Sequence, residues 1–409
     1  MGPPRPDEAG ARRDALHAGL ARAPAALFHF DPRIANGWLS DRYFVRSAGT
    51  LAHAGRDPRV TLQLFAKRVG VLAGVHEALR LVQTQLRPHR DGRPRDAAGC
   101  VQVESLLEGD AIAPQETVML LHAPYRCIAH LETPLLGTLA RRSLVASNVR
   151  RVIEAAGGKP VVFMGARHDD WRVQTADGYA AQVGGVRQVS SDAGGAWWGA
   201  RGVGTMPHAL IAAFGGDVVA ATLAFTRYVR DQEPDVGIVS LVDYHNDVVG
   251  DALAVARAMR DAFGPGVLSG VRVDTSEQLV DQALDGVTPA PGERLHGVTP
   301  RLVRLLRDRL DAGGFAGVGI VVSGGFTPTR IAEFEAAGVP VMAYGVGSSL
   351  LGHNRGEADG LLTSFDFTAD VVAVDGVPES KAGRGLRPST RLLPLDWERL
   401  RHLDAGGSA

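Results

Sequence analysis

The sequence has little lysine, little cysteine and no long apolar run. Lysine occurs only at Lys67, Lys159 and Lys381, so arginine supplies nearly all of the 44 basic residues, a bias typical of a GC-rich genome. An arginine in this chain therefore indicates a function only where its neighbours support one. Because no apolar run approaches the ~18 residues that cross a bilayer as a helix, we expect no membrane-spanning segment.

The two cysteines, Cys100 and Cys127, form neither a CxxC motif nor a disulfide framework, so the sequence favours a reducing, cytoplasmic location. The formal net charge is −1, which indicates neither a nucleic acid nor a membrane surface as a partner. Residues 1–19 mix acidic side chains with arginines and lack an apolar core, unlike a secretory or transit peptide. We expect residues 1–25 to be a disordered lead-in.

The residue patterns divide the rest of the chain into three parts. Within 26–134, short alternating runs such as VTLQLF and CVQVES accompany stretches of helical period, which predicts an α+β domain with an antiparallel sheet. From 135 to 355, apolar strand-like runs alternate with amphipathic helices about seven times, the signature of parallel βα units. Residues 356–409 return to loose alternation, and we expect them to pack back on the N-terminal domain.

Each strand-like run of 135–355 ends in a residue that is capable of chemistry or of binding an anion. In a barrel all strand carboxyl ends converge on one mouth, whereas in an open sheet only those beside the switch point do. The even spread therefore favours an α/β barrel over a doubly wound sheet. These residues are Arg167, Ser190, His208, Asp243, Asp274, Ser323 and Gly345.

Two glycine clusters follow consecutive strand-like runs, Gly324 and Gly325 in VVSGGFTPTR and Gly345 and Gly347 in AYGVGSSLL. Glycine lets backbone N–H groups approach an anion closely, and the serines that follow can add donors. A tight turn that merely needs glycine would explain one cluster. Two clusters, each ahead of a helix-like stretch, favour a phosphate site.

Other polar residues allow more than one interpretation. Arg272 and Asp274 in VRVDTSE lie on one side of a strand, as a plain salt bridge or as a pair that holds an anionic ring and ribose hydroxyls. Asp243, His245 and Asp247 in LVDYHND suggest metal ligands, but no further histidines nearby support a tight site. His208 in GVGTMPHAL borders an apolar run, where a histidine is usually a satisfied core residue, so its role depends on its neighbours.

Several stretches together resemble the nicotinate phosphoribosyltransferase family, in the branch shared with archaeal members. Their order and spacing, from about residue 41 to 350, are more specific than any single motif. The resemblance implies an irregular phosphoribosyltransferase-type α/β barrel with an N-terminal α+β domain. The stretches are DRYFVRS, VLAGVHEAL, LETPLLGTLARRSLVASN, FMGARHDD, GYAAQVGG, GTMPHA, LVDYHND, VRVDT and SGGFTPTRIAEFEAAGVPVMAYGVGSSL.

The resemblance also implies roles for individual residues. Arg167 would face the nicotinate and phosphoribosyl groups, and Arg272 with Asp274 would contact base and ribose. Tyr43 would stack on the pyridine in the partner subunit's site, and ATP would phosphorylate His208, which couples ATP hydrolysis to phosphoribosyl transfer. The expected catalytic residues are His208, Asp274 and Arg272, the expected substrate contacts are Tyr43, Arg167, Ser190, Thr205 and Asp243, and the expected phosphate contacts are Ser323, Gly324, Gly325, Gly345, Gly347 and Ser348.

The implied function is the synthesis of nicotinate mononucleotide from nicotinate and phosphoribosyl pyrophosphate, a step of NAD biosynthesis. The implied enzyme uses Mg²⁺ and ATP and works as a homodimer or a higher even oligomer. An alternative is a decarboxylating quinolinate phosphoribosyltransferase, but its dicarboxylate substrate calls for a denser cluster of cations than this lysine-poor chain offers. A preference for nicotinamide and a phosphate-binding barrel isomerase are more distant possibilities.

The chain departs from the family pattern in places. Arg167 is followed by His168 where paired arginines are common, and residues 274–277 read DTSE where DSGD is usual. These departures are the only support for a second alternative, a non-catalytic ligand-binding homologue. No cysteine follows Cys127, so we expect neither the zinc knuckle found in some archaeal members nor any other metal site built by the protein alone.

Overall fold

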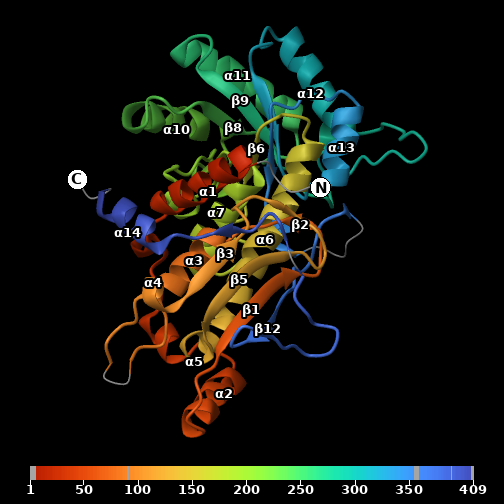
Figure 1. Ribbon diagram of the computed structural model, residues 1–409. Helices are drawn as coiled ribbons and strands as arrows, with labels where there is room; N and C mark the ends of the chain where they lie inside the picture. Colours follow the sequence, from red (N-terminus) through yellow and green to blue (C-terminus); the bar gives the residue numbers. More distant parts are fainter. Residues whose placement is uncertain (1–5, 90–91, 354–358, 388, 407–409) are drawn as a thin grey trace. The chain divides into compact units, whose positions relative to one another are not determined.

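The computed structural model describes residues 6–89, 92–353, 359–387 and 389–406 and divides the chain into two compact units (Figure 1). Unit 1 comprises Met1–Ser147 and Leu362–Ala409, and unit 2 comprises Asn148–Leu361. The sequence placed the domain boundaries at 134 and 355. The difference arises because α6 (Glu132–Ala155) continues from one unit into the other, so no loop or change of composition marks the boundary.

Unit 1 is built on a six-stranded antiparallel sheet in the order β13-β12-β1-β5-β3-β14. Its C-terminal strands pair with strands from the first part of the chain, and β12 lies along the whole of β1. The strands are β1 (Arg59–Ala66), β3 (Gln102–Ser105), β5 (Thr117–Pro124), β12 (Phe367–Val374), β13 (Val377–Pro378) and β14 (Leu393–Pro394), with a separate pair β2 (Gly70–Val71) and β4 (Ala111–Ile112). The helices are α1 (Pro6–Ala21), α2 (Arg42–His53), α3 (Val75–Thr84), α4 (Ala97–Cys100), α5 (Tyr125–Ile128), the first part of α6, and α14 (Trp397–Gly406).

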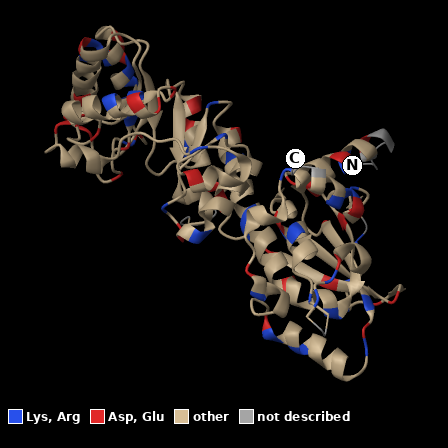
Figure 2. Ribbon diagram, turned by 90° about the vertical axis from the view of Figure 1, so that its left-hand side faces the viewer, with Lys and Arg blue, Asp and Glu red and all other residues tan. Residues whose placement is uncertain are grey.

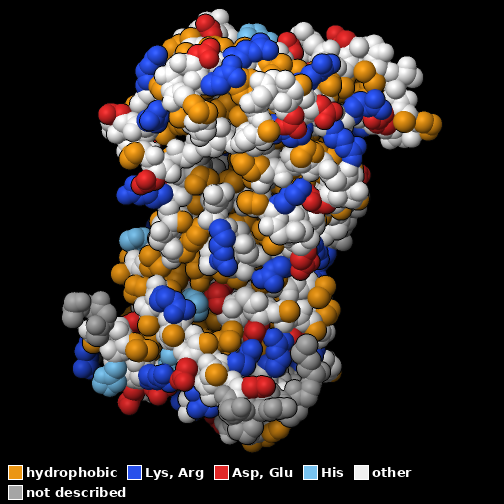
Figure 3. Space-filling view, turned by 90° about the horizontal axis from the view of Figure 1, so that it is seen from above, with side chains coloured by type: hydrophobic (Ala, Val, Ile, Leu, Met, Phe, Trp, Pro, Cys, Tyr) orange, Lys and Arg blue, Asp and Glu red, His pale blue; other side chains and the backbone are white. Residues whose placement is uncertain are grey.

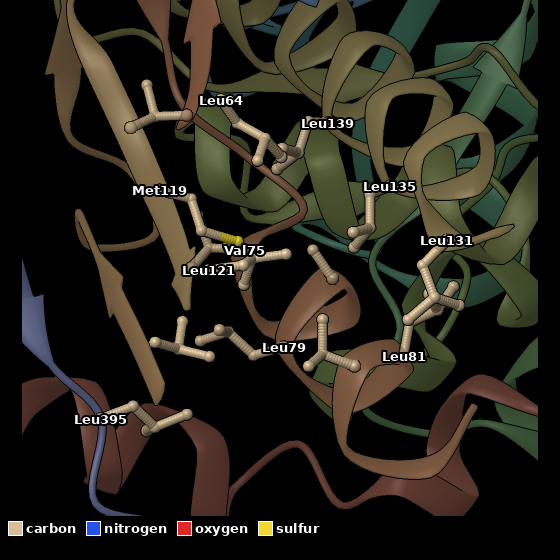
Figure 4. Packing of buried hydrophobic residues seen from close by; sticks show 14 of the residues in the cluster. Leu64, Val75, Leu79, Leu81, Met119, Leu121, Leu131, Leu135, Leu139 and Leu395 are labelled. Carbon is tan, nitrogen blue, oxygen red and sulfur yellow. The ribbon is translucent and has the colours of Figure 1, made fainter. Parts of the chain in front are cut away.

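The core of unit 1 lies between this sheet and its helices (Figure 4). Alternate residues of β1 and β5 point inward, and the register sets Leu64 opposite Met119 on the two strands. Helical spacing presents Leu135 and Leu139 of α6 and Leu79 of α3 to the same cluster. The alternating apolar residues of the strands and the helical spacing of apolar residues in α3 and α6 produce this packing.

The expected disordered lead-in is wrong for residues 6–21, which form α1; residues 1–5 lie outside the described residues. Leu16 and Leu20, four residues apart, are fully buried, and so is His17. His17 Nε2 accepts a hydrogen bond from the Asp396 backbone N–H at 3.0 Å, just before α14. The apolar stripe of α1 is too short to be recognised alone, and its partner lies at the other end of the chain.

Unit 2 is built on a six-stranded parallel sheet in the order β7-β6-β11-β10-β9-β8. The chain visits these strands in circular order, because the last strand, β11, pairs with the first, β6. The strands are β6 (Val161–Phe163), β7 (Gln188–Val189), β8 (Ile238–Leu241), β9 (Leu268–Val273), β10 (Gly319–Val322) and β11 (Ala343–Val346). The main helices are α7 (Gln174–Gly184), α10 (Val218–Gln232), α11 (Val248–Phe263), α12 (Pro300–Ala312) and α13 (Pro328–Ala336), with short α8 (Asp192–Gly195) and α9 (His208–Ala213).

The circle of strands is interrupted between β7 and β8, where the segment 202–206 takes the place of a strand. The backbone N–H of Val203 donates to Val189 O of β7 at 2.7 Å. On the other side, Met206 Sδ lies 3.6 Å from Ser240 Oγ of β8. The expected irregular α/β barrel with an N-terminal α+β domain is therefore confirmed.

Charged residues of both signs occur throughout the described part of the chain. Acidic and basic residues are interspersed along the ribbon of each unit (Figure 2), and the face in Figure 3 carries charged and apolar side chains intermingled. Among the described residues, no helix combines the length and the apolarity that a bilayer crossing requires.

Candidate active site

Unit 2 contains a cavity of about 620 Å³ at the carboxyl ends of its parallel strands. The strands converge there because they are parallel and arranged in a circle, so the residues that follow them meet at one mouth. All but two of the predicted site residues line this cavity, the exceptions being Asp243 and Tyr43. The predicted residues that line it are Arg167, Ser190, Thr205, His208, Arg272, Asp274, Ser323, Gly324, Gly325, Gly345, Gly347 and Ser348.

The two glycine loops form one wall of the cavity. Gly324 and Gly325 have φ of +90° and +66°, a region that other residues adopt only with strain. A Cβ on Gly347 would lie 2.9 Å from the backbone oxygen of Met164, so only glycine fits this close approach. The loops are joined, since Ser349 Oγ donates to Phe326 O at 3.0 Å. The wall thus presents backbone from two adjacent strand ends at a spacing that suits an anion.

A second cavity of about 670 Å³ adjoins the first and shares Gly325, Ser348 and Ser349 with it. Its lining includes Thr299 and Thr327, whose hydroxyls cap the N-termini of α12 and α13. Helix N-termini favour negative charge, but the acidic side chains Glu277, Glu293, Glu333 and Asp359 also line this second cavity.

Among the described residues, no salt bridge joins Arg272 to Asp274. The pair is therefore not the plain salt bridge that the sequence also allowed. Asp274 Oδ1 instead accepts a hydrogen bond from Ser323 Oγ at 2.8 Å. Burial lowers the pKa of Arg272, and its Nε is buried without a hydrogen-bond partner among the described residues. A buried donor without a partner is costly, and an anionic ligand in the cavity would satisfy it.

Arg167 and His168 stand at the end of β6. Arg167 is exposed at the cavity rim. The pKa of His168 is lowered, first by burial and then by the charges of Arg167 and His353, so this histidine is neutral near pH 7. The replacement of a paired arginine by His168 therefore reduces the positive charge of the site at neutral pH.

His208 is not a core histidine, because its side chain is 45% exposed and lines the cavity. Its Nε2 lies 3.1 Å and 3.2 Å from the two carboxylate oxygens of Asp243, a side chain only 5% exposed. This hydrogen bond raises the pKa of His208. The segment 202–206 that replaces a strand delivers His208 to the first position of α9, directly across from Asp243 at the end of β8.

The sequence predicted Asp243 as a substrate contact, but the structure places it under His208 and not among the residues that line the cavity. The proposed metal ligands of the same loop are also separated. His245 pairs with Asp251 at 3.1 Å, and Asp247 caps α11 by accepting from the Gly250 N–H at 2.9 Å. Within the described ranges, no three His, Cys, Asp or Glu side chains gather as metal ligands.

Tyr43 belongs to α2 of unit 1, where its side chain is 59% exposed and its hydroxyl donates to Asp41 Oδ2 at 3.3 Å. Its stacking on a pyridine in a partner subunit's site stays a prediction. Sequence reasoning missed several lining residues that lack reactive groups and carry no signal beyond their proximity to the motifs. They are Met164, Ala166, Val203, Gly204, Pro207, Ala209 and Phe326.

Comparison with known proteins shows which proteins this chain resembles. Residues 41–143 match the family described as quinolinate phosphoribosyl transferase, N-terminal domain. The nicotinate phosphoribosyltransferase pncB1 of Mycobacterium tuberculosis is 28% identical over 369 residues, which cover 84% of this chain and 74% of the relative.

Two solved structures have the same fold. The nicotinate-nucleotide pyrophosphorylase of Pyrococcus furiosus superposes with a TM-score of 0.71 at 27% identity, covering 92% of this chain and 95% of that one. Human nicotinic acid phosphoribosyltransferase superposes with a TM-score of 0.59 at 20% identity, covering 85% and 77%. The chain is thus similar over most of its length to a nicotinate phosphoribosyltransferase, and the two solved structures show that it has their phosphoribosyltransferase-type fold.

Proposed function

We propose that this chain transfers the phosphoribosyl group of phosphoribosyl pyrophosphate to the ring nitrogen of nicotinate, with ATP hydrolysed alongside. The products are nicotinate mononucleotide and pyrophosphate. The observation that carries the proposal is a single cavity lined by Arg167, Arg272, Asp274, His208 and the glycine loops, with Asp243 hydrogen-bonded to His208 from outside the lining. Relatives named nicotinate phosphoribosyltransferase support the choice of substrate.

The cavity residues suit a reaction that passes through a cationic sugar with a departing pyrophosphate. Such a reaction needs positioning and anion binding more than covalent chemistry on the sugar. The loops at Gly324 and Gly347 would hold phosphate oxygens through backbone N–H groups. Asp274, fixed by Ser323, would accept hydrogen bonds from ribose hydroxyls and stabilise the developing positive charge.

The arginines would bind the nicotinate carboxylate. A guanidinium forms short, paired hydrogen bonds with a carboxylate. Arg272 has a buried Nε without a partner among the described residues, and Arg167 stands exposed at the rim. Binding a flat anion between them would satisfy the buried donor and hold the ring nitrogen toward the sugar.

Mg²⁺ fits this site as an ion that arrives with the substrate. Magnesium is usually held by one or two carboxylates together with substrate phosphates, and Asp274 offers such a carboxylate on the cavity wall. When bound, the ion would neutralise charge on the departing pyrophosphate.

His208 is the residue that would accept a phosphoryl group from ATP. Because both oxygens of Asp243 face Nε2, the carboxylate holds the proton on that nitrogen and leaves the lone pair on Nδ1. A neutral imidazole with a fixed tautomer is a competent nucleophile. Asp243 is therefore a positioning residue, and His208 acts on the reacting group.

Quinolinate is the less suitable substrate. Its second carboxylate would need further cations, and the basic residues that line the cavity are Arg167, His168, His208 and Arg272 among the described residues. Lys159 of unit 2 does not contribute, because its ammonium group pairs with Glu335 at 2.8 Å. The free cysteines are in keeping with our further proposal that the protein works in the cytoplasm.

The test supplies phosphoribosyl pyrophosphate and Mg²⁺ with nicotinate, quinolinate or nicotinamide, each with and without ATP, and separates the products by chromatography. The variants are His208→Ala and, as a matched control, His245→Ala, since His245 also pairs with an aspartate at 3.1 Å but lies outside the cavity lining. We expect nicotinate mononucleotide from nicotinate, with ATP stimulation lost only in His208→Ala. Turnover of quinolinate with release of CO₂ would assign the sister activity, and ligand binding without turnover would indicate a non-catalytic homologue.

A further inference from the structure

The structure brings the two cysteines of the chain together in unit 1. Cys100 ends α4 and Cys127 lies in α5. The antiparallel register of β3 and β5 sets Gln102 opposite His122, so the chain just before β3 runs beside the chain just after β5. The two thiols are close enough to influence each other's ionisation, and neither is in a disulfide.

The surroundings hold this arrangement in place. The backbone N–H of Arg87 donates to Cys127 O at 3.1 Å, and Arg95 Nε donates to Arg87 O at 2.9 Å. Arg59, opposite Pro124 in the sheet, adds a second positive charge near Cys100. Two arginines on independent segments therefore place positive charge at the cysteine pair, opposed in part by the carboxylate of Asp57.

The two cysteines are unequal in access and in acidity. Cys100 is partly exposed, whereas the side chain of Cys127 is buried. The interaction with the Cys127 thiol, with the charges of Arg95 and Arg59, lowers the pKa of Cys100 to about 7. The same interaction and burial raise the pKa of Cys127. A partly exposed thiol in positive surroundings is the reactive kind, and a neighbouring protonated thiol can resolve its products.

We propose that Cys100 and Cys127 are a reversible redox pair, which a low-molecular-weight disulfide such as oxidised glutathione converts to an intramolecular disulfide. This proposal does not depend on the transferase activity. The Cys100 thiolate attacks one sulfur of the oxidant, forming a mixed disulfide and releasing one thiolate. Cys127 then loses its proton to the released thiolate and attacks the Cys100 sulfur, which expels the second thiolate. In total, two protein thiols are oxidised and one small disulfide is reduced to two thiols.

The test uses the full, reduced chain at neutral pH with graded ratios of oxidised to reduced glutathione. Samples are quenched in acid, alkylated, and examined by intact mass and on non-reducing gels. We expect both thiols to be lost together, with a chain lighter by two hydrogen atoms, no lasting glutathione adduct, no crosslinked dimer, and full recovery with dithiothreitol.

Single variants separate the roles of the two sulfurs. Cys127→Ser should stop at one glutathione adduct on Cys100, and Cys100→Ser should leave Cys127 unmodified over the same range. Circular dichroism and the thermal midpoint check that both variants are folded. The wild-type measurement alone can overturn the proposal. A stable adduct on Cys100, crosslinked dimers, or two free thiols at ratios that oxidise the urea-denatured chain would each contradict it.

Discussion

Replacement of Asp243 by asparagine tests the role of the His208–Asp243 pair. Asparagine has nearly the same shape, and the site is 5% exposed, so the backbone around it should be preserved. The change removes the negative charge that faces His208 Nε2 at 3.1 Å and 3.2 Å. A neutral amide oxygen can still accept a hydrogen bond but no longer fixes the tautomer through charge.

The size of the effect follows from the kind of hydrogen bond that is lost. A bond to a charged group contributes about 1.5–3 kcal/mol and a neutral bond about 0.5–1.5 kcal/mol, so the variant loses about 1–2 kcal/mol. Since every 1.4 kcal/mol is about tenfold, ATP-stimulated formation of nicotinate mononucleotide should fall by about 5- to 30-fold. The ATP-independent rate at saturating phosphoribosyl pyrophosphate should change little, because Asp243 is not among the cavity-lining residues.

The pH dependence gives a second readout with a definite sign. Asp243 raises the pKa of His208, so the wild-type histidine becomes neutral only at a pH above the ordinary value. Without the carboxylate the pKa falls, and the acidic limb of ATP-dependent activity should move to lower pH. The deficit should therefore be largest at alkaline pH, where both proteins have a neutral histidine, and should shrink on acidification.

The assay measures nicotinate mononucleotide with and without ATP from pH 5.5 to about 9, together with acid-labile phosphate on the protein. Asp251→Asn is the matched control, because Asp251 pairs with His245 at 3.1 Å outside the cavity lining. An equal loss of ATP-independent activity, or an acidic limb that does not move, would refute the assigned positioning role.

The remaining predictions concern close packing, pH-dependent stability and assembly. Gly347→Ala forces a Cβ to 2.9 Å from Met164 O, a strain of about 1–3 kcal/mol. This strain should raise the KM for phosphoribosyl pyrophosphate about 5- to 150-fold. The control is Gly317→Ala, whose Cβ meets nothing within 4 Å and which should leave the KM unchanged. Burial raises the pKa of Glu108 from 4.5 to about 7, so the folded chain retains a proton that the unfolded chain releases, and stability should fall by about 3 kcal/mol as pH rises from 5 to 8. In Glu108→Gln, the denaturant midpoint should fall less steeply with rising pH than in the wild type. An unchanged slope would contradict the assignment of this pH dependence to Glu108. Co-expressed Tyr43→Ala and His208→Ala chains, each without ATP-stimulated activity alone, should regain about a quarter of the wild-type ATP-stimulated activity if Tyr43 serves the partner's site in a homodimer. No recovery in a purified mixed dimer would contradict that arrangement.

The barrel could be predicted from the sequence because its signals are local. Each βα unit repeats an apolar run, a polar or glycine end and an amphipathic helix, and the residues at strand ends must meet once the strands are parallel and circular. Arg167, Ser323 and Gly347 were found in this way, and all line the cavity. The helix at residues 6–21 could not be found, because its stripe is completed only by packing beside the C-terminal helix of the same unit.

The contacts of Asp243 and of the two cysteines could not be predicted from the sequence for a related reason. Asp243 stands at a strand end like the other site residues, and nothing in LVDYHND distinguishes a side chain that faces the cavity from one that faces a histidine 35 residues earlier. Cys100 and Cys127 show no motif, and their proximity follows from strand register. A function that depends on contacts between side chains of different helices and strands can be inferred only from the folded structure.

The irregular step of the barrel explains why the histidine is available for chemistry. A regular strand between β7 and β8 would alternate its side chains between barrel interior and outer helices, and it would hydrogen-bond along its whole length. The segment 202–206 instead pairs with β7 through Val203 and packs on β8 through Met206. After Pro207, α9 begins at His208, which is thereby placed at the mouth with one face toward Asp243 and the rest of its ring toward the cavity. A broken strand thus holds the proposed nucleophile beside its carboxylate and leaves it open to the cavity, an arrangement that a closed sheet at this position would prevent.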